Sequence, residues 1–182
     1  QADRFLEKRQ GKKGQFAEGL SVVDSAPPWA APGDLAAELY LTANAGFWLA
    51  YFGFAKAALQ AAHFLRIHLD TDANKLPSFA QTHWLACGLA WQLNVHDLIE
   101  SLEPRLYLYA RLPQSTNDLA WMLTTLLCAD YPTNHDIIVN GLKQLGKMQK
   151  AAGRFPSDEG QDVHTTLEAL RVFAKWDADK PD

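Results

Sequence analysis

Gln149-Lys-Ala-Ala-Gly153-Arg-Phe155 and Gln10-Gly-Lys-Lys-Gly14-Gln-Phe16 are two stretches of this chain with the same spacing of glutamine, glycine and phenylalanine. Each follows a helix-like segment and precedes a polar loop. The two glutamines lie 139 positions apart. That distance equals three repeats of about 46 residues, and periods of this size are typical of stacked helical repeats. The pattern therefore predicts an array of helical hairpins rather than one compact bundle.

Helix signals dominate the remaining sequence, and no stretch alternates polar and apolar residues as a strand does. Some polar side chains are suited to accept hydrogen bonds from the first amide groups of helices: those of Asp34, Ser78, and either Ser115 or Thr116. Pro104 falls inside one predicted helix, where we expect a kink or a break. The predicted helices cover about residues 2–9, 35–51, 54–69, 79–93, 95–111, 116–129, 134–152 and 163–176.

The predicted helices alternate in character along the chain. Those that begin near Asp34, Ser78, Thr116 and Asp162 are rich in Ala, Leu, Trp and Thr, and most of those between them carry more charged or amide side chains. The helix over residues 54–69 fits this division less well. A helix that is apolar all round is buried, and one with a polar stripe faces water. We therefore expect inner and outer helices in an all-α fold, an α/α toroid or partial toroid.

Composition limits the class of protein further. The 182 residues are 48% hydrophobic and carry a formal net charge of −4. These values suit a sizeable core and offer no concentrated basic surface for nucleic acid. Residues 39–55 lack charges but reach only the lower edge of the length that spans a bilayer, so we predict no membrane span. We expect a single domain over residues 1–176 and a charged tail over residues 177–182.

The cysteines and the start of the chain bear on its origin. Cys87 and Cys128 lie among apolar residues, which suits buried thiols and a cytoplasmic protein, although a disulfide between them stays open. The chain opens on helix-like sequence without an initiator Met. We therefore expect it to be part of a longer protein.

The chain resembles the terpenoid-cyclase and protein-prenyltransferase α/α toroid superfamily. In that family a Gln ends an outer helix, and a Gly followed after one residue by an aromatic residue opens the next loop, as in the two stretches quoted above. The family favours Trp at the aromatic position, where this chain has Phe16 and Phe155. Asp162-Val163-His164-Thr165 resembles the start of an inner helix of the family. Four helix pairs are visible, which implies a partial ring.

The resemblance points to catalytic candidates but argues against cyclase chemistry. Protonating cyclases of the family place Asp-x-Asp-Asp at an inner-helix start, with the middle Asp as the acid. This chain has His164 and Thr165 in the last part of that pattern, after Asp162. An imidazolium is too weak an acid to protonate an alkene. The candidates for any catalysis are Asp162, His164 and Asp118.

The same resemblance also bears on a metal site. Protein prenyltransferases of the family hold zinc with an Asp, a Cys and a His, for which Asp118, Cys87 and either His83 or His164 are the matching residue types. His83 and Cys87 lie four residues apart on one helix face and could chelate a metal. Because neither stands in a recognised local motif, we predict no metal and no cofactor.

Aromatic residues fall on the predicted inner helices. In the family such residues line an apolar central cavity and stabilise carbocations through their ring faces. The resemblance therefore implies an isoprenoid-like ligand, an apolar small molecule, bound without protonation chemistry. The candidate ligand-binding residues are Trp48, Trp84, Trp91, Trp121 and His83.

Two alternatives stay open. In a carbohydrate-active α/α barrel, a polysaccharide lyase or glycosidase, tryptophans would stack on sugars and Asp118, Asp162 or His164 would act as acid or base. In a non-catalytic helical scaffold, a curved surface would bind a protein partner. An exposed apolar patch at the open ends of the array, rather than an enclosed pocket, would favour the scaffold.

Overall fold

The computed structural model describes residues 2–113, 115–157 and 160–178, and these residues form helices and no strand. The prediction of an all-α fold is thereby confirmed. No helix of the described residues is long and apolar enough to cross a membrane. The toroid stays a prediction.

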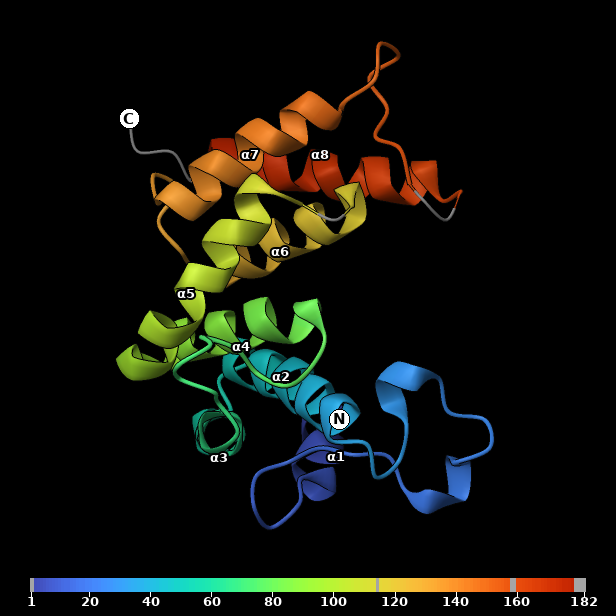
Figure 1. Cartoon of the computed structure of the whole chain (residues 1–182), viewed down its shortest axis with the longest axis vertical. Coiled ribbons are helices and arrows are strands. Elements are labelled where there is room, and N and C mark those ends of the chain that lie inside the picture. Colours follow the sequence, from blue (N-terminus) through green and yellow to red (C-terminus); the bar gives the residue numbers. More distant parts are fainter. Residues whose placement is uncertain (1, 114, 158–159, 179–182) are drawn as a thin grey trace. The chain divides into compact units, whose positions relative to one another are not determined.

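The chain divides into two compact units at the bond between Glu103 and Pro104. The first unit contains α1 (Ala2–Arg9), α2 (Leu35–Tyr51), α3 (Ala55–Ile67), α4 (Ala80–Leu93), the 3-10 turns η1 (Leu20–Val22) and η2 (Pro28–Ala30), and the first half of α5 (His96–Arg111) (Figure 1). The second contains the rest of α5, α6 (Thr116–Cys128), α7 (Asp136–Met148) and α8 (Asp162–Ala178). We describe each unit by itself, and the single domain over residues 1–176 stays a prediction.

In the first unit α2 packs against both α3 and α4, and α3 also contacts α4. The α2 backbone approaches closely at Gly46, where an added Cβ would lie 2.8 Å from Ala61 of α3 and 2.8 Å from Leu89 of α4. Residues 82–90 of α4 are all buried. This burial on every side is what an apolar helix without a polar stripe requires.

In the second unit α6 packs against α7 and α8. The α7 helix buries one face, with Ile138 and Leu145 fully inaccessible, and exposes Lys143 and Lys147 on the other. Its amphipathic pattern is that of the predicted outer helices. The predicted end of this helix near residue 152 is wrong, because α7 ends at Met148 and the following residues form a turn.

Helix starts were predicted correctly where the cap is local. The Asp34 carboxylate accepts a hydrogen bond from the Ala37 amide at 2.8 Å, and the Ser115 hydroxyl accepts one from the Asp118 amide at 3.0 Å. Ser78 is not a cap, because its hydroxyl donates to the Ala36 carbonyl at 2.6 Å and so links α2 to the start of α4. The α5 helix is continuous across Pro104, so the chain does not break there, and the alternative of a kink stays a prediction.

The first residues of α2, α4, α6 and α8 are 45, 36 and 46 positions apart, so the expected period fits two of three intervals. The repeated stretches themselves fold alike. The side-chain amide of Gln10 donates to the Gly14 carbonyl at 3.0 Å, and the side-chain amide of Gln149 donates to the Gly153 carbonyl at 2.9 Å. Both glycines have positive φ, +94° and +78°, which favours glycine over residues with a Cβ.

We predict that Gly14→Ala destabilises the chain more than Gly33→Ala. Both glycines have positive φ, a cost of roughly 1–2 kcal/mol for alanine. A Cβ at Gly14 would also collide with the backbone carbonyl of Gln60, whereas nothing lies within 4 Å of a Cβ at Gly33. Urea unfolding should show an extra loss of about 1–3 kcal/mol for Gly14→Ala. Equal losses for the two variants would contradict the close seating of this turn on α3.

Candidate functional site

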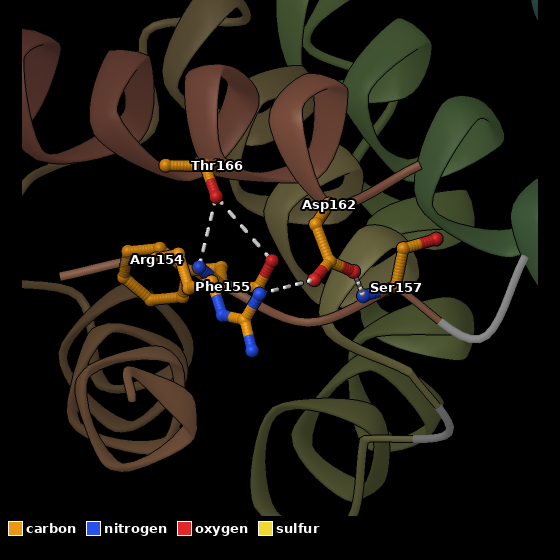
Figure 2. A network of polar contacts seen from close by, with 5 residues as sticks. All are labelled: Arg154, Phe155, Ser157, Asp162 and Thr166. Atoms are coloured by element: carbon orange, nitrogen blue, oxygen red, sulfur yellow. Dashed lines mark hydrogen bonds and ion pairs between the residues drawn. The ribbon is translucent and has the colours of Figure 1, made fainter. Parts of the chain in front are cut away.

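The predicted catalytic residue Asp162 lies at the start of α8, where both of its carboxylate oxygens contact the preceding loop. Oδ1 accepts a hydrogen bond from the Ser157 amide at 2.8 Å, and Oδ2 lies 3.5 Å from the Arg154 guanidinium (Figure 2). These contacts hold residues 154–157 against α8. His164, two residues further along the helix, is exposed. Asp162 therefore has a structural role that explains its presence without catalysis.

Asp118 lies in the first turn of α6, where its backbone amide is capped by Ser115 and its side chain is half-buried. Each of the two predicted carboxylates thus belongs to the start of a separate helix. Among the described residues, no cluster of three or more His, Cys, Asp or Glu side chains could hold a metal ion. Cys87 and Cys128 are both thiols. The catalytic roles of Asp118, Asp162 and His164 stay predictions.

His83, a predicted ligand-binding residue, is buried in the first unit and both of its ring nitrogens are engaged. Nε2 accepts from the Leu76 amide at 3.2 Å, so Nδ1 carries the proton and donates to the Phe79 carbonyl at 3.0 Å. The segment before it holds a third turn, in which the Asp70 and Lys75 backbones pair. His83 fixes this turn to α4, and neither ring nitrogen is left to bind a ligand.

The four predicted ligand-binding tryptophans have different environments. Trp84 is only 2% exposed in α4, and Trp91 and Trp121 are half-buried. Trp48, near the end of α2, is 40% exposed and stacks on Phe52 with ring centroids 6.0 Å apart. Trp48, Trp84 and Trp91 belong to the first unit and Trp121 to the second. Trp48 is therefore the one that offers a ring to an incoming partner.

Trp48 lines an open groove of about 300 Å³ between α1 and α2. Most of its lining side chains are apolar. Arg9 of α1 also lines it, and the Arg9 guanidinium lies 3.6 Å from Glu18 and 5.1 Å from the Phe5 ring centroid. Asn44 is the polar residue of the α2 side. The lining residues are Phe5, Leu6, Arg9, Phe16, Ala17, Glu18, Leu41, Asn44, Ala45 and Trp48.

Asn44 is engaged with a neighbour on α2. Its side chain hydrogen-bonds to the hydroxyl of Tyr40. Burial raises the pKa of Tyr40, and this hydrogen bond opposes part of that rise. The Tyr40 ring packs edge-on against Trp29 and Phe79, each with centroids 6.0 Å away. Tyr40 therefore stays neutral at physiological pH, and the groove has no ionisable group on its α2 side.

A threonine fixes the register between each repeated stretch and the helix that follows it. The Thr42 hydroxyl accepts from the Phe16 amide at 2.8 Å and lies 3.4 Å from the Phe16 carbonyl. The Thr166 hydroxyl does the same for Phe155, at 2.9 Å and 3.3 Å (Figure 2). Because the same atoms make the same contacts, Thr42 of α2 and Thr166 of α8 are equivalent positions in the two repeats.

This equivalence relates the groove to a packed interface. Thr165 lies one position before Thr166, and Ala169 and Val172 lie three and six positions after it. All three are at most 1% exposed, and their helix, α8, packs against α6. The matching α2 residues, which line the groove, are Leu41, Ala45 and Trp48. Beside α2 the groove therefore occupies the place that α6 occupies beside α8.

Sequence reasoning identified Trp48 but missed the rest of the groove. Leu41 and Ala45 sit in a stretch that is apolar all round, where no pattern separates a covered face from an open one. Phe5 and Leu6 are adjacent apolar residues in a short predicted helix, and two residues are too few to indicate a binding face. Only Phe16 belongs to a motif that the sequence singled out.

A wider hollow of about 770 Å³ lies between the turn at Lys12 and Lys13 and the outward face of α3. It is lined by mixed polar and apolar side chains, including His63 and Ile67, and most of these are exposed. This face is the solvent side of a helix whose other face packs on α2 and α4.

Comparison of the chain with protein-family models, with curated proteins and with solved structures finds no match. The resemblance to the terpenoid-cyclase and prenyltransferase superfamily stays a prediction. The candidate site therefore has to be interpreted from its own geometry.

We predict that Thr166→Val destabilises the chain by about 1–2 kcal/mol, because it removes a hydroxyl that pairs with the Phe155 amide. Thr124→Val is the matched control in the same unit, since the buried Thr124 hydroxyl has no hydrogen-bond partner. We expect that second change to be neutral or stabilising by a few tenths of a kcal/mol. Thermal and urea unfolding would measure both, and equal losses would argue against the register contact.

Proposed function

We propose that this chain is a non-catalytic helical-repeat scaffold that binds an apolar α-helix of a partner protein in the groove between α1 and α2. One observation carries the proposal. Leu41, Ala45 and Trp48 are repeat-equivalent to α8 residues on the helix that packs against α6, yet they line an open groove. A face built to receive a helix is the best account of this difference.

The equivalence also defines the ligand. The helix that packs against α8 is α6, whose buried residues are mostly apolar and include Leu119, Met122, Leu123 and Leu126. A partner helix that fits beside α2 should likewise present apolar side chains three and four residues apart along one face. Trp48 is an anchor of the type that dominates helix-in-groove interfaces, since aromatic residues near the centre of a contact carry much of its affinity.

The polar groups of His83 and Asp162 are engaged in structural contacts, which favours a binding function over a catalytic one. Both nitrogens of His83 are engaged in backbone hydrogen bonds. Both oxygens of Asp162 contact the loop before α8. The exposed aromatic residues at the end of α2, Tyr51 and Phe52, extend the apolar surface beyond the groove. These observations support the scaffold over a sugar-cleaving barrel, which needs two carboxylates facing one cleft.

The isoprenoid-like ligand is the alternative proposal. It is favoured by Trp48, the one predicted cavity residue that lines the groove. A volume of about 300 Å³ lies at the lower end of the range for small-molecule sites. A groove that is open along its length fits a helix better than a site that must surround most of a small molecule.

The test is titration of the full chain with a synthetic peptide of residues 115–129, in which Cys128 is replaced by Ser and a lysine tail aids solubility. We expect saturable binding by calorimetry. We expect Ala45→Glu to weaken it at least tenfold, because a carboxylate would be buried without a partner. Leu59→Glu is the matched control, since Leu59 is an exposed residue of α3 outside the groove.

Three results would overturn the proposal. The first is equal binding of a scrambled peptide. The second is unchanged binding by Ala45→Glu while circular dichroism shows all variants folded. The third is binding of farnesyl or geranylgeranyl diphosphate in the groove without binding of the peptide, which would support the isoprenoid-like ligand instead.

A further inference from the structure

The α8 helix carries two apolar faces on opposite sides. One holds Thr165 and Ala169, which are buried on the helix that packs against α6. The other holds Val163, Leu167 and Leu170, which are 77%, 52% and 48% exposed. Residues spaced by four and three positions share one helix face. An exposed apolar stripe of this kind is unusual on a helix that faces only water.

The threonine register shows what this stripe is built to do. Thr166 of α8 corresponds to Thr42 of α2. In this register, Val163, Leu167 and Leu170 correspond to Leu39, Ala43 and Gly46 of α2. Leu39 and Ala43 are fully buried. Gly46 lies against Ala61 of α3 and Leu89 of α4. The exposed stripe of α8 is therefore the equivalent of the face that α2 buries against α3 and α4.

The chain thus exposes both halves of an interface that it already uses internally. The stripe on α8 is equivalent to a face that packs forward onto the next helix. The groove beside α2 is equivalent to a face that receives the previous helix. Internal repeats normally need polar caps at their ends to stay soluble and separate. Neither of these two faces is polar.

We propose that the helix bound by the α1–α2 groove is α8 of a second copy of this chain, so that copies associate head to tail. This rests on the proposed function, because it names the occupant of the same groove. Leu167 and Leu170 of one copy would pack against Ala45 and Trp48 of the next. The contact reproduces between copies the pairing of faces that joins neighbouring inner helices within one copy.

A head-to-tail contact uses two different surfaces, so each copy keeps one open end after it has bound one neighbour. Such heterologous contacts produce rings when the rotation closes and open chains when it does not. This property separates the proposal from a symmetric dimer, in which one surface meets itself and no end remains.

The experiment uses two full-length variants, each with one disabled end. Ala45→Glu blocks the groove and leaves α8 intact, whereas Leu167→Glu blocks the stripe and leaves the groove intact. Leu59→Glu is the control for an added carboxylate elsewhere. Sedimentation equilibrium from micromolar to submillimolar concentration measures the mass. We expect the unmodified chain and Leu59→Glu to associate further with concentration, and each disabled variant alone to stay monomeric.

The decisive sample is the equimolar mixture of the two disabled variants. It should form a dimer of twice the monomer mass that grows no further, because one good groove and one good stripe remain. A mixture that stays monomeric, or an unmodified chain that is monomeric throughout, overturns the inference. If the unmodified chain is monomeric but still binds the peptide of residues 115–129 in the groove, the proposed function stands and only self-association fails.

Discussion

The burial of apolar side chains on two opposite faces of one helix is the constraint on which the rest of this structure depends. The α2 helix satisfies it on one side against α3 and α4, where Gly46 permits close approach of the backbone. The α8 helix satisfies it on the other side, against α6. A helix of this kind always needs a neighbour on each side, so any array of finite length leaves apolar surface at its ends. The groove beside α2 and the exposed stripe of α8 are apolar surfaces of this kind.

A turn before α2 and a turn before α8 are each tied to the helix by a threonine. In two copies a glutamine caps the turn, a glycine with positive φ reverses the chain, and a threonine hydroxyl bonds to the phenylalanine amide. In the copy before α4, Asn74 takes the left-handed position and His83 supplies the acceptor. The turns at Gly14 and Gly153 make the same backbone hydrogen bonds, so their threonine partners can serve as a common origin for comparing helix faces. The turn at Asn74 differs, because the Asp70 and Lys75 backbones pair with each other.

How far prediction reached depended on how local each interaction is. Asp34 and Ser115 cap helices through amide groups three residues away, so their roles follow from the sequence. Ser78 looks equally suited to a cap, but the Ala36 carbonyl from another helix competes for its hydroxyl. The third turn went unnoticed because it lacks the Gln, Gly and Phe of the other two. Asp162 and His83 were singled out for chemistry because their backbone partners cannot be seen in the sequence.

The sequence by itself determined the helical class, most of the helix boundaries and the two turns that mark the repeats, since hydrogen bonds and side-chain preferences within a few residues control these features. Only the tertiary structure decided which apolar faces are covered. Leu39 and Ala43 are buried against neighbouring helices, whereas Leu41 and Ala45 line a groove. Both pairs consist of a leucine and an alanine four positions apart. Burial is a property of what lies next to a side chain, and distant parts of the chain supply that neighbour.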